Sequence, residues 1–240
     1  MKKTNRFAYT KLAVAILAAG SSATVSAQML EEIVVTAQQR AQSLQDVPVS
    51  VSAISAQKMS NAGVVDLEGL STYVPNFSIN ETGISTSITI RGISSGINPG
   101  FEQSVGMYND GVFYGRDQLA RTPLFDLERV EVLRGTQSIL FGKNSIAGAV
   151  SMISAKPTDE FEGSFTALYE PDADEQDLRL VLSGPLTDNL RGRIAIMDRQ
   201  QEGYFKNTTF NKDEQVEDES FIRGTLAWDV TDNVTASLKV

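Results

Sequence analysis

A strict alternation of apolar and polar residues runs through the last third of the 240-residue chain, from Phe161 onward. Successive side chains of a β-strand point to opposite faces, so each run predicts a strand with one apolar and one polar face. Arg191 and Arg193, for example, alternate with apolar neighbours. The runs are Phe161–Tyr169, Leu178–Leu182, Leu190–Ile196, Ile222–Trp228 and Val234–Val240. The pattern predicts five amphipathic antiparallel strands.

The connections between these strands differ in length. Gly184–Asn189 and Thr231–Asn233 are tight, whereas Asp172–Gln176 and Gln200–Ser220 are longer and polar. Short turns on one side and long loops on the other are typical of an outer-membrane β-barrel, although a soluble sandwich also has alternating strands. Five strands cannot close a barrel, so we expect a longer protein, with about 22 strands if the barrel is of the wide, plugged kind.

Residues 47–157 carry shorter, mixed elements, which predict a small α+β domain of about a hundred residues. Val47–Ile54 alternates like a strand, and Ser55 and Asp66 are placed to cap two short helices. Asn109–Gly111 is a strong hairpin-turn signal. Short strands are predicted at Ser87–Arg91, Val105–Tyr108, Val112–Tyr114, Val130–Arg134 and Ala149–Ile153.

The N-terminus has the three parts of a secretory signal peptide. Basic residues precede an apolar run, Leu12–Gly20, and small residues follow at Val25–Ala27. The apolar run is far shorter than the ~20 residues of a membrane-spanning helix, which argues against the alternative of a transmembrane anchor. We therefore predict an exported protein whose signal peptide, residues 1–27, is cleaved after Ala27.

The composition narrows the range of functions. The formal net charge of −9, which becomes more negative when the basic signal is removed, argues against a nucleic-acid partner. The chain has neither cysteine nor histidine, which excludes thiolate metal sites and nucleophiles activated by histidine. We therefore expect a protein that is not an enzyme and that has no metal site and no cofactor. A hydrolase that uses only carboxylates is the alternative. The acidic stretches Asp172–Asp177 and Asp213–Glu219 are interpreted as solvated loops, with a calcium site as the alternative.

A short β-prone segment follows the predicted signal and precedes a polar stretch, Gln38–Gln45. One interpretation is an edge strand of the next domain. The other is an extended peptide that adds a strand to the exposed sheet edge of a partner, where main-chain hydrogen bonds supply the affinity. The segment consists of Glu31, Glu32, Ile33, Val34, Val35, Thr36 and Ala37.

Four sequence motifs in one order carry a resemblance to a known family. Phe125–Pro157 reads FDLERVEVLRGTQSILFGKNSIAGAVSMISAKP, and EEIVVTA, ITIRG and MYNDGVF occur at Glu31–Ala37, Ile88–Gly92 and Met107–Phe113. The long motif is similar to the plug signature of TonB-dependent receptors, and EEIVVTA is similar to their TonB box. Departures such as Thr136, where proline is usual, leave the turn glycines in place.

The resemblance implies a domain organisation and a location. Residues 1–27 would be the signal peptide, 28–46 the TonB box with its linker, 47–157 the plug, and 158–240 the first strands of a transmembrane barrel. The fold class expected is an α+β plug followed by antiparallel barrel strands. The location expected is the bacterial outer membrane, with membrane lipid around the barrel and a TonB protein pairing with Glu31–Ala37 as an added strand.

The resemblance also implies residue roles. Arg91 and Arg134 each precede a glycine at the end of a predicted strand, where family members pair plug arginines with glutamates of the barrel wall; solvated strand-end arginines are the alternative. Phe101, Tyr114 and Arg116 lie in predicted apical loops and are candidate ligand contacts, because an aromatic face and a cation suit an anionic chelate; packing of the plug is the alternative.

The motifs indicate the family but do not specify the transported ligand. A ferric siderophore or another iron complex is the expected small-molecule ligand, since iron complexes are the commonest substrates of the family. Haem, cobalamin and oligosaccharides are alternatives with the same mechanism. A passive porin is the alternative from another class, but it would not begin with a folded domain and a strand-forming peptide.

Overall fold

The computed structural model describes residues 34–36, 42–82, 85–96, 102–116, 120–171, 174–203, 205–214 and 216–240. The predicted signal peptide, residues 28–33, Ala37 and Phe101 lie outside the described residues. Within the described ranges, no helix is both long and apolar enough to cross a membrane.

Five strands form the central sheet of the predicted plug, in the order β3-β9-β10-β7-β8, among the described residues. Strand β10 lies antiparallel to β9 and parallel to β7. Asp110 and Gly111 both have positive φ, 49° and 81°, and close the predicted hairpin between β7 and β8. The strands are β3 (Val51–Ser55), β7 (Val105–Asn109), β8 (Val112–Tyr114), β9 (Leu127–Arg134) and β10 (Gly148–Ser154).

The two predicted helices begin at their predicted caps. The Ser55 side chain accepts a hydrogen bond from Lys58 N at the start of α2 (Ala56–Asn61). The Asp66 side chain accepts one from Gly69 N, at 2.6 Å, at the start of α3 (Leu67–Ser71). Each cap satisfies one of the amide groups that a helix start leaves unpaired, which is why the helices begin there.

The two faces of the central sheet carry separate core clusters, because alternate residues of a strand point to opposite sides. The larger core includes Val130 and Val132 of β9 together with helix residues such as Leu67 and Leu70. The smaller core, on the other face, consists of Val35, Val47, Tyr108, Leu133 and Ala149, with partly buried neighbours around them. The helices therefore cover one face, and residues preceding β3 cover the other.

Smaller elements complete the plug. The strands β4 (Phe77–Glu81), β5 (Thr86–Ile90) and β6 (Ile93–Ser94) form an antiparallel sheet of their own. Strand β5 matches the predicted strand at Ser87–Arg91, whereas β4 was not predicted. The one-turn helix α4 (Ser138–Phe141) was not predicted either, and it has no side-chain cap.

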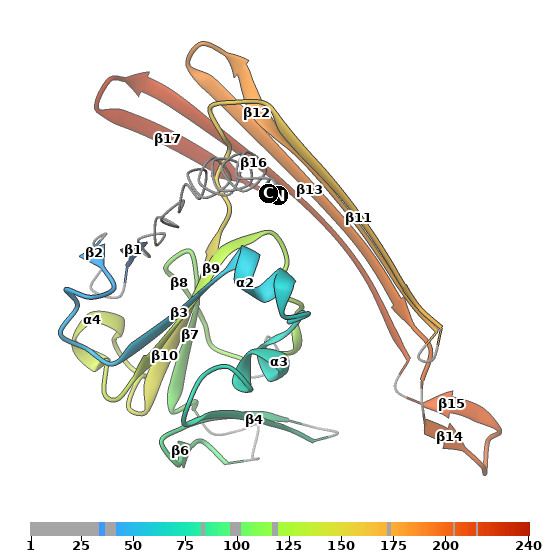
Figure 1. The fold of residues 1–240 in the computed structure, drawn as a ribbon. Coiled ribbons are helices and arrows are strands. Elements are labelled where there is room, and N and C mark those ends of the chain that lie inside the picture. Colours follow the sequence, from blue (N-terminus) through green and yellow to red (C-terminus); the bar gives the residue numbers. More distant parts are fainter. Residues whose placement is uncertain are drawn as a thin grey trace, which may run out of the picture. The chain divides into compact units, whose positions relative to one another are not determined.

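The five predicted amphipathic strands form one antiparallel sheet in the described part of the chain, in the order β11-β12-β13-β16-β17 (Figure 1). Every neighbouring pair is antiparallel. Leu178 and Ile196 lie on an exposed apolar face, and Arg193 and Arg199 point to the opposite face. The strands are β11 (Glu162–Glu170), β12 (Glu175–Thr187), β13 (Leu190–Gln201), β16 (Glu217–Thr231) and β17 (Val234–Lys239).

The connection between β13 and β16 is more ordered than the predicted polar loop. It contains a short hairpin of β14 (Phe205–Asn207) and β15 (Lys212–Glu214), which extends beyond the ends of the long strands in Figure 1. The other three connections are short, with four residues, 171–174, between β11 and β12 and two residues each at 188–189 and 232–233. The connection between β13 and β16 is therefore long as predicted, whereas the predicted longer loop Asp172–Gln176 is wrong, because β12 already begins at Glu175.

Candidate functional site

The described part of the predicted TonB box lies against the plug. Val34 and Val35 form β1, which pairs antiparallel with β2 (Gln42–Ser43) over two residues. Val35 is completely buried in the smaller core, whereas Val34 is 42% exposed. The sequence offered an edge strand or a free peptide as alternatives, and the structure shows a short local pairing within the predicted linker.

Thr36 binds a buried carboxylate of the plug. The Thr36 amide donates to Glu131 Oε1 at 2.8 Å, and the Thr36 hydroxyl donates to the same oxygen at 3.2 Å. Arg129 Nε donates to that oxygen as well, at 2.8 Å. Arg129 also pairs with the more exposed Glu128. Both Glu131 and Arg129 belong to β9, so the plug signature itself holds the segment.

A second contact joins the plug to the long sheet. Arg193 donates from Nε and Nη2 to Asp126 Oδ1, at 2.9 and 2.7 Å, and the Asp126 side chain is only 1% exposed. Arg223 Nη1 donates to the carbonyl of Phe125 at 2.7 Å, and its guanidinium lies 5.3 Å from the Phe125 ring centre. Phe125 packs with Ala195 and Met197 of β13. The polar face of the sheet is therefore the face that receives the plug.

Asp110 provides a third plug contact. Its carboxylate accepts hydrogen bonds from the Ser154 amide and hydroxyl, at 2.9 and 2.8 Å, and from Lys239 of β17. Burial alone would raise the pKa of the Asp110 carboxyl, but the hydrogen bonds from Lys239 and Ser154 outweigh burial and lower that pKa below its ordinary value. Asp110 therefore stays ionised and links the β7–β8 turn to the sheet.

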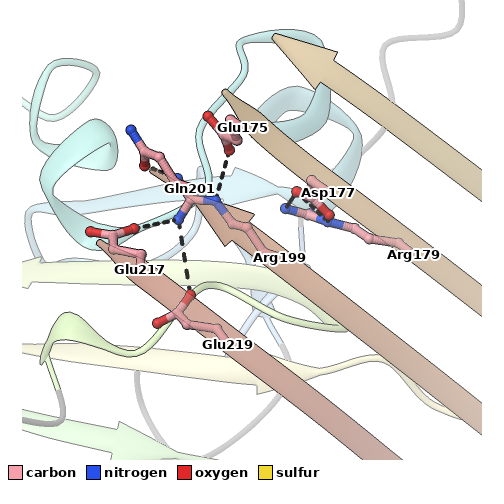
Figure 2. Close-up of polar contacts among 7 residues, drawn as sticks. All are labelled: Glu175, Asp177, Arg179, Arg199, Gln201, Glu217 and Glu219. Carbon is pink, nitrogen blue, oxygen red and sulfur yellow. Dashed lines mark hydrogen bonds and ion pairs between the residues drawn. The ribbon is translucent and has the colours of Figure 1, made fainter. Parts of the chain in front are cut away.

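An ionic cluster lies on the same polar face, at the loop end of the long strands (Figure 2). Arg199 is 8% exposed, and its Nε donates to Glu175 at 2.7 Å, its Nη1 to Glu217 at 3.0 Å and its Nη2 to Gln201 at 3.2 Å. One guanidinium therefore ties β12, β13 and β16 together. The remaining members are Asp177, Arg179 and Glu219. In the residues that the structure describes, no group of metal-ligating side chains forms a metal site.

The two predicted plug arginines lie near each other. The Arg91 amide donates to the Asn76 carbonyl at 2.9 Å, and Arg134 Nη1 donates to the Pro75 carbonyl at 3.2 Å. The Arg134 Nε is buried and has no hydrogen-bond partner within the described ranges. Arg91 is exposed and has a φ of 52°. Their pairing with glutamates of a barrel wall stays a prediction.

The described ligand-contact candidates lie at the end of β8. Tyr114 is partly buried and packs on the larger core, and Arg116 is exposed. Tyr114 therefore has a packing role, and a ligand-contact role for either residue stays a prediction. Near them in sequence, Arg121 donates to Thr86 Oγ1 at 2.6 Å and to the Thr82 carbonyl at 2.5 Å, and so holds the β4–β5 connection.

Comparison with known proteins identifies the family. The family model for the TonB-dependent receptor plug domain matches residues 43–149. The iron-regulated outer membrane virulence protein of Vibrio cholerae is 33% identical over 172 residues, which cover 67% of this chain and 26% of that protein. The chain belongs to the TonB-dependent receptor family.

Two other TonB-dependent receptors extend the match into the long strands. The pesticin receptor of Yersinia pestis is 29% identical over 206 residues, 83% of this chain and 30% of that protein. The crystal structure of the ferric yersiniabactin uptake receptor FyuA from Yersinia pestis superposes with a TM-score of 0.70 at 26% identity, over 80% of this chain and 31% of that one. This chain therefore spans less than a third of these receptors' length.

The predicted fold class and location are confirmed. The chain has the α+β plug of a TonB-dependent receptor, followed by antiparallel strands that match those of receptor barrels, and it is an outer-membrane protein. The family comprises receptors, not enzymes.

Sequence reasoning did not identify the residues that hold Thr36 on the plug or that join the plug to the long strands of this TonB-dependent receptor. Asp126 and Glu131 both lie in the recognised plug signature, but they were not singled out. The sequence pattern does single out Arg193 and Arg223, since both are polar residues on the face opposite the apolar one. Arginines on the inner, polar face of such a sheet point to an internal partner, because a charge removed from water without a partner is unfavourable.

Proposed function

We propose that the receptor takes up a ferric siderophore or another iron complex across the outer membrane, driven by TonB. The observation that carries this proposal is the docked segment Val34–Thr36. It is held by a two-residue strand pairing, one buried valine and hydrogen bonds to Glu131. These few contacts suit a segment that is released and then pairs with a TonB protein as an added strand.

The relatives support iron as the cargo. One is named as an iron-regulated outer membrane protein, and another as a ferric yersiniabactin uptake receptor. We propose the domain organisation of the sequence analysis as well, with the signal at 1–27, the TonB box and linker at 28–46, the plug at 47–157 and barrel strands at 158–240. The plug match over residues 43–149 supports it. The proposed activity is transport without catalysis.

Uptake of ⁵⁵Fe-labelled siderophores by cells with and without TonB tests the proposal. Val34→Pro removes an amide that an added strand would use, whereas the matched control Val34→Thr keeps the amide and the β-branched shape. We expect V34P and loss of TonB to abolish uptake, and V34T to retain it. Uptake that continues without TonB would instead support a passive porin, and uptake of haem or cobalamin alone would replace the iron complex as the cargo.

A further inference from the structure

Glu131 is a charged residue in the interior of the plug's central sheet. Its side chain is completely buried in the central sheet, between Ala53 of β3 and Ser151 of β10. The small size of these two neighbours leaves room for a carboxylate on the face of the smaller core. A buried carboxylate is costly unless hydrogen bonds compensate for the lost water.

The hydrogen bonds of Glu131 depend on the TonB-box segment. Oε1 accepts from the Thr36 amide, the Thr36 hydroxyl and Arg129 Nε. Oε2 is buried and accepts no hydrogen bond from any residue that the structure describes. Two of the three donors therefore come from Thr36, and the adjacent Val35 fills the smaller core.

We propose that Glu131 is a latch that holds the TonB-box segment against the plug, an inference that rests on the proposed function. Glu131 acts as a positioning residue, because it fixes Thr36 and takes no direct part in binding cargo. Arg129 Nε pairs with Glu131 Oε1 and orients the carboxylate, so the acceptor is in place whether or not Thr36 is bound.

The chemistry of the latch makes release reversible. When Val34–Thr36 leave, water can reach the face that they covered, and Glu131 exchanges the two Thr36 bonds for bonds to water. Hydrogen bonds to Glu131 therefore hold the segment, and bonds to water largely replace them on release. The segment is not held by burial of a large apolar surface. A pull on the segment can open the latch without unfolding the larger core, which lies on the other face of the sheet.

Cysteine labelling in isolated outer membranes, without ligand, tests the latch directly. The chain contains no cysteine and Val35 is completely buried, so the labelling rate of Val35→Cys reports how often the segment opens. We expect Glu131→Gln in this background to raise the rate of maleimide labelling about tenfold or more, because bonds to a charged acceptor are the stronger ones. The matched control Glu128→Gln makes the same charge change on the same strand at a residue that pairs with Arg129 and not with Thr36. It should label within about twofold of V35C alone.

A second variant approaches the latch from the segment. Thr36→Pro removes the amide that donates to Glu131 and leaves the plug sequence unchanged, so it remains informative if E131Q does not fold. Equal labelling rates in E131Q and E128Q would overturn the latch, as would an unchanged rate in T36P when E131Q fails to fold. Faster labelling of E131Q together with uptake that does not require TonB would support the latch and overturn the proposed function. Unchanged labelling together with TonB-dependent uptake would overturn the latch and support the proposed function.

Discussion

The contact between Asp126 and Arg193 gives the sharpest test of how the plug is held on the strands. The perturbation is Asp126→Asn, which keeps the shape of the side chain and one acceptor but removes the charge. Asn is the right substitute because residue 126 has a φ of 49°, which asparagine tolerates and alanine does not. The measured change then reports the ion pair and not backbone strain.

The expected magnitude follows from burial. The side chains of Asp126 and Arg193 are 1% and 11% exposed, and both hydrogen bonds reach the same carboxylate oxygen. Removing one partner of a buried pair costs about 3–5 kcal/mol, and the acceptor retained by asparagine recovers part of it, so we expect about 2–4 kcal/mol. The exposed pair Lys143–Glu102, at 73% and 66% exposure, is the matched control, and Glu102→Gln should cost less than about 1 kcal/mol.

Native-state hydrogen exchange of the β9 amides in the receptor is the assay. A loss of about 2–4 kcal/mol lowers protection roughly 30- to 700-fold, at a factor of ten per 1.4 kcal/mol. A double-mutant cycle with Arg193→Met isolates the pair, and its coupling energy should exceed about 1 kcal/mol. A coupling energy within about 0.5 kcal/mol of zero would show that this pair does not hold the plug.

Three further predictions follow from the same structure. Arg199→Met leaves Glu175, Glu217 and Glu219 without their buried cation (Figure 2) and should destabilise the folded receptor by about 3–5 kcal/mol. Circular dichroism should show this loss as a lower melting temperature. Because the pKa of Asp110 is lowered in the folded protein, its ionised carboxylate stabilises the plug fully above the ordinary carboxyl pKa. This stabilisation is lost as the pH falls through the lowered pKa. Lys239→Met removes one cause of the lowering, so the hydrogen-exchange protection of the plug should be lost at a higher pH than in the unmodified receptor. Gly148→Ala would place its Cβ against the Leu133 carbonyl oxygen and should reduce the yield of folded receptor on gels.

Periodicity and turn chemistry predicted much of the fold. The alternation beyond Phe161 gave the five long strands and their faces, and Ser55, Asp66 and Asn109–Gly111 gave the helix starts and the hairpin. These are local signals, since a strand face or a cap depends on residues a few positions apart. Strand β4 and helix α4 were not found, because each is only one short element without a clear repeat.

Contacts across the chain could not be predicted in the same way. Asp126 and Arg193 are 67 residues apart, and Thr36 and Glu131 are 95 apart, so no spacing rule connects them. The polar face of the long sheet also contains Met197, which alternation alone does not explain. The pattern shows which face a side chain is on, but the tertiary fold decides its partner.

The position of β3 has a mechanical consequence. This strand lies at the edge of the central sheet and borders only β9 in the described structure, and it is the first strand of that sheet along the chain after the predicted TonB box. Once Thr36 has left Glu131 of β9, a tensile load on Val34–Thr36 passes along the chain to β3 before it reaches any interior strand. An edge strand loaded from one end can peel away bond by bond, whereas shearing an interior strand requires many bonds to break together. The order of strands therefore predicts that a pull on the proposed TonB box detaches β3 first and leaves β9, β10 and β7 paired.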